Sequence, residues 1–143
     1  MTIARPINSE LGGFGQAVGY VIAAMEPDLA RLELDIGPLH HNRLGFVHGG
    51  VITTLIDAAG GRAGMHCTVP GNRRSSVTVS LTVSFQRAVR HGRLIATGRR
   101  LDGGQRIFTA TIEVRHDSGL LVASGLGNYR YLRGSERPEG VPA

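Results

Sequence analysis

The chain has 143 residues, of which 41% are hydrophobic and 19% are charged, so it is long enough for one domain with its own core. No apolar run approaches the ~20 residues of a membrane span, and no signal-peptide pattern opens the sequence. The single cysteine, Cys67, excludes a disulfide framework or a thiolate zinc cluster within one chain. We therefore expect a cytoplasmic protein that binds neither a membrane nor a metal.

All 16 basic residues are arginine. Without lysine, the protein has no Schiff-base or P-loop lysine chemistry. The formal net charge is +5, but the arginines are spread from Arg5 to Arg137, and the aromatic residues are only four Phe and three Tyr. A nucleic-acid partner is therefore not expected. Because guanidinium groups match phosphate geometry, a phosphorylated small molecule fits this charge better.

The first half of the chain predicts a hairpin followed by a loop. Residues 1–15 carry no sustained hydrophobic period, and we expect them to form an N-terminal segment that covers part of the domain or frays. Two extended stretches within residues 16–36 predict a hairpin with one buried face. Residues 37–50 are rich in Gly, Pro and Asn and predict a loop.

One long helix is expected over residues 49–66. At about 100° per residue, its apolar side chains fall within one arc, and these are Val51, Ile52, Leu55, Ile56, Ala59 and Ala63. The pair Gly60 and Gly61 lowers helix stability by ~1 kcal/mol per glycine relative to alanine, which indicates that another backbone passes close by.

The second half of the chain predicts strands at residues 76–85, 92–101, 106–115 and 120–131. The first of them has the cleanest period of two, which would place on one face Val77, Val79, Leu81, Val83 and Phe85. The polar, Gly- and Pro-rich residues 133–143 predict a flexible tail.

The predicted elements, two strands, one helix and four strands, occupy a single domain over residues 16–132. One helix cannot cover both faces of a six-stranded sheet, and such a sheet would keep two free edges. An antiparallel sheet wrapped around the helix and paired with a second copy solves both problems. We therefore expect an α+β protein with the hotdog fold, in which about six strands surround one long central helix, and a homodimer.

The start of this helix is the candidate site. Gly49 and Gly50 leave backbone N–H groups unobstructed where the helix dipole is positive, so they can hold a developing oxyanion. Asp57 follows eight residues after Gly49, about 12 Å away along one helix. If two helices pack antiparallel across a two-fold axis, Asp57 of one subunit can approach Gly49 of the other.

These residues also carry a resemblance. The string His48-Gly49-Gly50, with Asn42 six residues before it, Asp57 nine residues after His48 and a strand over residues 78–88, resembles the phenylacetate-degradation (PaaI-type) hotdog acyl-CoA thioesterases. The resemblance implies hydrolysis of an acyl- or aryl-CoA thioester to the free acid and coenzyme A.

The resemblance also implies roles for these residues. Asp57 would be the nucleophile or general base, and the Gly49 N–H would be the oxyanion hole. His48 and Asn42 would orient the thioester, and Thr78 would hold the attacking water.

Coenzyme A would be part of the substrate, and neither a cofactor nor a metal is implied. Its path is expected to follow Gly50, Arg87, Arg90, Gly104 and Arg106. The resemblance further implies self-association as a homodimer or a dimer of dimers. The sequence departs from the family at Ala88, where many members have Pro, and the N-terminal segment lacks the helix that some members carry.

Each site residue also has a structural interpretation. Asp57 could lie on a solvated helix face, His48 could cap its own loop, Asn42 could serve a tight turn, and Thr78 could belong to a half-exposed strand. His40 and His41 have no carboxylate or cysteine at ligand spacing, which argues against a metal site.

One other function remains possible, a non-catalytic acyl-CoA sensor that uses the same pocket. A hotdog dehydratase is not expected, because it would need a histidine about five residues after its aspartate. After Asp57, the next histidine is His66. The sequence leaves the acyl group open.

Overall fold

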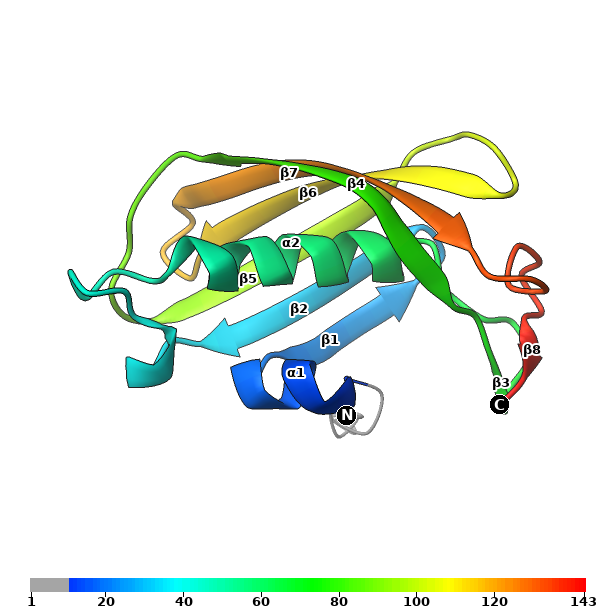
Figure 1. Cartoon of the computed structure of the whole chain (residues 1–143), viewed down its shortest axis with the longest axis horizontal. Coiled ribbons are helices and arrows are strands. Elements are labelled where there is room, and N and C mark those ends of the chain that lie inside the picture. The colour runs from blue at the N-terminus through cyan, green and yellow to red at the C-terminus, as the bar shows by residue number, and fades with distance from the viewer. Residues whose placement is uncertain (1–10) are drawn as a thin grey trace.

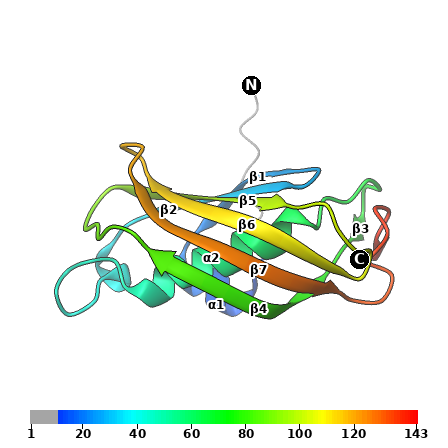
Figure 2. The ribbon, with the colours of Figure 1, turned by 90° about the horizontal axis from the view of Figure 1, so that it is seen from above.

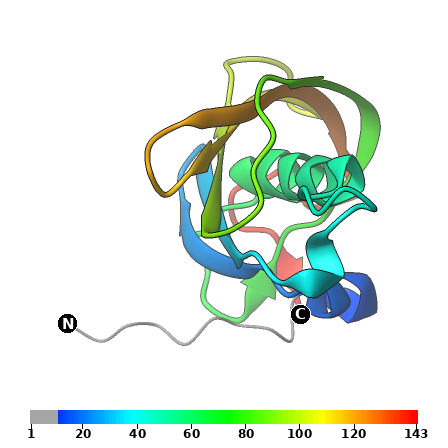
Figure 3. The ribbon, with the colours of Figure 1, turned by 90° about the vertical axis from the view of Figure 1, so that its left-hand side faces the viewer.

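A six-stranded antiparallel sheet curls around one central helix in the computed structural model, which describes residues 11–143 (Figures 1 and 3). The strand order is β1-β2-β5-β6-β7-β4. The elements in chain order are α1 (Gly12–Val18), β1 (Val21–Glu26), β2 (Leu29–Asp35), the 3-10 helix η2 (Pro38–His40), α2 (Gly49–Ala63), β3 (Asn72–Arg73), β4 (Ser76–Phe85), β5 (Arg93–Arg100), β6 (Ile107–His116), β7 (Leu121–Tyr131) and β8 (Val141–Pro142). The expected α+β hotdog architecture is confirmed.

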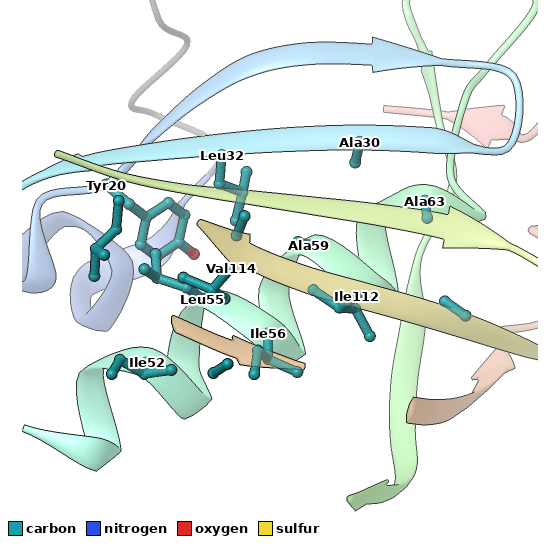
Figure 4. Packing of buried hydrophobic residues seen from close by; sticks show 14 of the residues in the cluster. Tyr20, Ala30, Leu32, Ile52, Leu55, Ile56, Ala59, Ala63, Ile112 and Val114 are labelled. Carbon is teal, nitrogen blue, oxygen red and sulfur yellow. The ribbon is translucent and has the colours of Figure 1, made fainter. Parts of the chain in front are cut away.

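The core lies between α2 and the concave face of the sheet (Figure 4). Leu55, Ile56 and Ala59 of α2 are fully buried against strand residues such as Ile112 and Val114. Each large apolar side chain buried in this way contributes roughly 1.5–3 kcal/mol. The helix therefore owes its stability to packing more than to its glycine-containing sequence.

Glycines set the closest approach of α2 to the sheet. A Cβ on Gly98 of β5 would collide with the backbone oxygen of Ala59, so glycine lets this strand contact the helix backbone. The same Cβ would lie 3.1 Å from the Gly60 nitrogen, so a backbone does pass close to Gly60, as predicted, while a Cβ on Gly60 itself would collide with the Tyr129 hydroxyl.

The N-terminal region differs from its prediction, because residues Gly12–Val18 form helix α1. Residues 1–10 of the predicted N-terminal segment lie outside the described residues. Three of the seven residues of α1 are glycine, which has a low helix propensity, so contacts made elsewhere decide its structure. Gly15 packs against the Tyr20 hydroxyl, and Gly19, at φ 89°, ends the helix in the left-handed conformation.

The C-terminal segment, residues 133–143, also differs from its prediction as a flexible tail. Its strand β8 pairs with β3, and Ser135 is buried with its hydroxyl accepting a 2.8 Å hydrogen bond from the Ser75 N–H. Arg74 donates to the Ser135 carbonyl at 2.8 Å. Hydrogen bonds therefore hold this polar segment against residues 67–75, which follow α2.

One long edge of the sheet is formed by β4, beside β7 (Figure 2). Three of its apolar side chains are strongly exposed in the single chain, namely Val77 at 44%, Val79 at 58% and Phe85 at 55%. No helix within residues 11–143 is long and apolar enough to cross a membrane.

Candidate active site

The loop before α2 is shaped by Asn42. Its side-chain Oδ1 accepts hydrogen bonds from the N–H groups of Leu44 at 2.9 Å and Phe46 at 3.1 Å, and Gly45 has φ 80°. These contacts show Asn42 in the turn-forming role that its residue type favours. The loop in turn fixes where His48 and α2 begin.

His48 is the N-cap of α2. Its Nδ1 accepts a 2.8 Å hydrogen bond from the Gly50 N–H, and its own N–H donates to the carbonyl of His40 at 2.7 Å. Because Nδ1 accepts, the neutral ring carries its proton on Nε2. The cap thus leaves His48 with a donor that can contact a ligand.

Gly49 is the first residue of α2. Its N–H has no acceptor among the described residues, whereas the N–H groups of Gly50, Val51 and Ile52 are all bonded to His48. A Cβ on Gly49 would lie 3.4 Å from the Phe85 ring, so this position is half-covered by the end of β4. A free donor at the positive end of a helix suits a developing negative charge.

Asp57 and Thr78 are joined directly. The Thr78 hydroxyl donates to Asp57 Oδ1 at 2.7 Å, and the Tyr129 hydroxyl donates to the backbone oxygen of Asp57 at 3.2 Å. Burial raises the pKa of Tyr129 above its ordinary value, and the negative charge of Asp57 raises it further. Asp57 is half-buried, so it does not lie on a freely solvated face.

A β-bulge explains why Thr78 faces the helix. Strict alternation along β4 would place Thr78 on the face opposite Leu81, but the pairing with β7 shifts between Thr78 and Ser80. After this shift, Leu81 and Val83 face the core as well. The extra residue, Val79, re-aims the strand, as bulges beside functional sites commonly do.

Within one chain, Gly49 and Asp57 are not brought together. Both lie on α2, and the eight residues between them correspond to about 12 Å along the helix axis. A single thioester carbonyl cannot contact both groups in one protomer.

The arginines expected along the coenzyme A path divide into two groups. Arg90 donates to the Leu44 carbonyl at 2.6 Å and stacks 3.8 Å from the Phe46 ring centre, so it adjoins the loop before α2. Arg87 is exposed in the same connection, after β4. Gly50, at the helix start, is already bonded to His48.

Gly104 and Arg106 lie at the opposite end of the molecule. The Arg106 carbonyl accepts from the N–H of Tyr131, whose hydroxyl reaches Gly64 at the end of α2. The Gly104 carbonyl accepts from Arg100 at 3.3 Å. Figures 1 and 2 show this turn, between β5 and β6, far from the loop that precedes α2. The structure therefore separates these two residues from Arg90 within one chain.

His40 was not predicted as a site residue. It is buried, with Nδ1 accepting from the Gly37 N–H at 2.9 Å and Nε2 lying 2.6 Å from the carbonyl of Val18. Its carbonyl also receives the His48 N–H. No sequence pattern marks this role, since it depends on a contact 22 residues away. Among residues 11–143, no group of three or more His, Cys, Asp or Glu could hold a metal ion.

Comparison with known proteins identifies the family. The model of the thioesterase superfamily matches residues 44–123. A Deinococcus radiodurans protein, provisionally named an esterase, is 31% identical over 126 residues, which cover 87% of this chain and 82% of the relative. The medium/long-chain acyl-CoA thioesterase YigI of Escherichia coli is 26% identical over 129 residues, with 81% and 83% of the two chains covered.

A solved structure agrees with these relatives. A mutant of the phenylacetic acid degradation protein PaaI from Thermus thermophilus superposes with a TM-score of 0.72 at 25% identity, covering 83% of this chain and 98% of that one. The resemblance drawn from the His48-Gly49-Gly50 string is thereby confirmed. The chain belongs to the thioesterase superfamily and is a thioester hydrolase with the hotdog fold.

Proposed function

We propose that this protein hydrolyses acyl-CoA thioesters to the free acid and coenzyme A, with Asp57 as the catalytic carboxylate. The observation that carries the proposal is the 2.7 Å hydrogen bond from Thr78 to Asp57 Oδ1, on the helix whose first residue, Gly49, has an unbonded N–H. The name of the Escherichia coli relative supports acyl-CoA as the substrate class.

The site is completed by a second copy of the chain. If two α2 helices pack antiparallel, with the two-fold axis near Thr53, midway between Gly49 and Asp57, each Asp57 lies beside the Gly49 of the other subunit. The exposed apolar edge of β4 supports this dimer, because a long unpaired edge strand favours pairing with another chain. A dimer of such dimers is compatible with the same interface.

In this arrangement the thioester oxygen accepts the Gly49 N–H, and the helix dipole stabilises the oxyanion. Asp57 either removes a proton from a water that attacks the carbonyl carbon, or attacks this carbon itself to form an acyl anhydride, which a water then hydrolyses to release the acid and restore the carboxylate. In both routes the carbon–sulfur bond breaks, and the thiolate of coenzyme A leaves and takes up a proton. Thr78 occupies Oδ1 of the carboxylate, which leaves Oδ2 for the water or the carbonyl carbon. His48 donates from Nε2 to the substrate.

The same dimer brings the two groups of basic residues closer. The end of one α2 points toward the start of the other, so the turn with Gly104 and Arg106 from one subunit approaches Arg87 and Arg90 of its partner. Their guanidinium groups would bind the phosphates of coenzyme A. The chemistry uses side chains and backbone groups of this chain, with neither a cofactor nor a metal.

The decisive experiment is hydrolysis of an acyl-CoA panel by the wild type and by Asp57→Asn. Because the amide cannot act as nucleophile or base, we expect kcat/KM to fall at least about 100-fold. Asp35→Asn, a change of the same kind at an exposed ion pair with Arg93, is the matched control and retains activity. Undiminished turnover in Asp57→Asn would overturn the assignment.

Thr78→Val refines the same experiment. It keeps the shape of the side chain and removes the hydroxyl on Asp57, so we expect kcat to fall about tenfold, within the range for a hydrogen bond to a charged group. Thr82→Val on the same strand, where the side chain is exposed, is the control.

A further inference from the structure

Apart from tyrosines, His40 and Ser135 are the only buried residues of polar or charged type among residues 11–143. Burial of a polar ring costs free energy unless its nitrogen atoms are hydrogen-bonded. Nδ1 of His40 accepts from the Gly37 N–H at 2.9 Å, so the neutral ring carries its proton on Nε2 and donates it to the Val18 carbonyl at 2.6 Å. Neither bond takes part in the proposed reaction, so that chemistry does not explain why His40 is buried.

Through these bonds His40 joins the end of α1 to the start of α2. Val18 is the last residue of α1, so its carbonyl is one of those that a helix leaves without an internal partner, and the His40 ring bonds to it. The backbone carbonyl of His40 accepts a 2.7 Å hydrogen bond from the N–H of His48, the N-cap of α2. One residue therefore bonds to a terminal residue of each helix.

The bond between His48 and His40 bears directly on the Gly49 N–H. This N–H belongs to the peptide group that joins His48 to Gly49, so a shift of the His48 backbone moves it. A donor to an oxyanion must lie about 2.7–3.1 Å from the oxygen, and a misplacement of about 1 Å can lower the rate on the order of 100-fold. His40 is therefore located where it can set the position of the free donor.

The ring bond to Val18 is the part of this link that no other group replaces. The turn η2 keeps its backbone bond from the His40 N–H to the Gly37 carbonyl, at 3.0 Å, whichever side chain stands at position 40. Among residues 11–143, no other hydrogen bond joins α1 to η2. The ring therefore anchors the turn, and with it the start of α2, to the N-terminal helix.

We propose that His40 is a positioning residue for thioester hydrolysis, which holds the Gly49 N–H in place by bonding α1 through its ring and His48 through its carbonyl. The proposal rests on the proposed function, because that function assigns the Gly49 N–H to the thioester oxygen. His40 acts through His48 and neither gives nor takes a proton in the reaction.

Three substitutions at one position separate the two ring bonds. His40→Leu removes both of them. His40→Gln places an amide N–H near the former Nε2 and can keep the bond to Val18, whereas His40→Asn places an amide oxygen near the former Nδ1 and can keep the bond to Gly37. His116→Leu is the matched control, because both ring nitrogens of His116 are also bonded, to Ser118 and to the His91 carbonyl.

The readout is steady-state hydrolysis of octanoyl-CoA at a temperature at which every variant is folded. We expect His40→Leu and His40→Asn to lower kcat about tenfold and to change KM less than about twofold, since the lost interaction acts on the transition state. His40→Gln should restore kcat to within about threefold of the wild type, and His116→Leu should not change it. Wild-type kcat in His40→Leu, or rescue by His40→Asn rather than by His40→Gln, would overturn the proposal.

A double-mutant cycle tests whether His40 acts through the Gly49 N–H. Gly49→Pro removes this N–H, so His40→Leu has no donor left to displace in that background. We expect the second substitution to lower kcat less than about twofold there, against about tenfold in the wild type. Equal effects in both backgrounds would show that His40 acts by another route, and the proposal would be wrong.

Hydrogen exchange provides a test that does not depend on hydrolysis. In His40→Leu and His40→Asn, the amides of residues 50–52, which are bonded to His48, should exchange faster than in the wild type and in His40→Gln. Mass spectrometry of peptides that cover the start of α2 measures this. Full turnover in Asp57→Asn would refute the proposed function without affecting the exchange result, whereas unchanged exchange in His40→Leu would refute the role of His40 whatever the rates.

Discussion

The two ends of α2 differ in how their backbone groups are hydrogen-bonded. Every helix leaves unpaired N–H groups at its start and unpaired carbonyls at its end. Just after α2, the Tyr131 hydroxyl donates at 2.6 Å to the carbonyl of Gly64, the C-cap residue, and Arg74 donates at 2.9 Å to the carbonyl of His66. At its start the Gly49 N–H stays unbonded among the described residues. The carbonyls that follow the helix are therefore bonded by side chains, whereas the start keeps a free donor, which the proposed function assigns to the thioester oxygen.

The largest effect is expected from Gly49→Pro, which tests the free donor at the start of α2. Proline is tolerated at the first helical position and His48 already has the extended backbone that proline requires of its predecessor, so the change removes the N–H with little effect on folding. We expect kcat to fall about 100- to 1,000-fold, as for loss of one oxyanion donor. Steady-state hydrolysis of octanoyl-CoA measures it.

Gly49→Ala is the control for this change. It keeps the N–H, and its Cβ would make an ordinary 3.4 Å contact with Phe85, so activity should be close to that of the wild type. Co-expression of Gly49→Pro with Asp57→Asn adds a test of the shared site, since each hybrid dimer would hold one intact site of two. With random pairing half of the dimers are hybrids, so the mixture would recover about a quarter of the activity and purified hybrids about half. No recovery in purified hybrids would place both groups in one subunit.

A smaller effect is expected from Tyr131→Phe, which tests the bonded carbonyl just after α2. The substitution leaves the buried Gly64 carbonyl without its donor, so the free energy of unfolding should fall by about 1–3 kcal/mol. Urea unfolding measures this loss, and kcat/KM should not change. The contrast between the two ends would fail if Tyr131→Phe lowered kcat while leaving stability intact.

The smallest effect concerns the middle of α2, where Tyr129 contacts the backbone of Asp57. Because burial raises the pKa of Tyr129, the folded protein keeps this phenol protonated at alkaline pH while the unfolded chain ionises near pH 10.0. The contribution of protonated Tyr129 to the free energy of unfolding is fully present below pH 10. It is lost as the pH rises above 10, by at most about 1.4 kcal/mol per pH unit. Tyr129→Phe should flatten this slope in urea unfolding measured from pH 9 to pH 11. An equal slope in both proteins would show that Tyr129 is not its source.

The regular elements were predictable where hydrophobic periodicity governs them. Residues 76–85 are a strand over the predicted range, and α2 begins at the predicted Gly49, although it ends at Ala63 rather than at residue 66. Helix α1 and the C-terminal segment were not predictable, because neither has an apolar period. Distant partners hold them instead, with His40 bonded to α1 and Arg74 to Ser135.

The candidate site was predictable to a similar degree. The sequence predicted His48 and Gly49 at the start of a helix and Asp57 about two turns further along it, and the structure has this arrangement. The hydrogen bond between Thr78 and Asp57 could not be predicted, because it depends on a β-bulge that no residue type in β4 indicates. Predicting the contact of His40 with Val18 would have needed the position of α1. Predicting that Arg90 and Arg106 lie far apart would have needed the order of the strands.

The bulge at Val79 divides β4 into two parts with different contacts. Before it, Thr78 serves the carboxylate, and after it, Leu81 and Val83 serve the core. Because the extra residue lets both parts face α2, the polar residue near Asp57 can change without disturbing the packing that follows. Deleting one residue at this point would rotate Thr78 away from Asp57 while the core half of the strand kept its register. A local irregularity in one edge strand thus makes the chemistry and the stability of this enzyme separately evolvable.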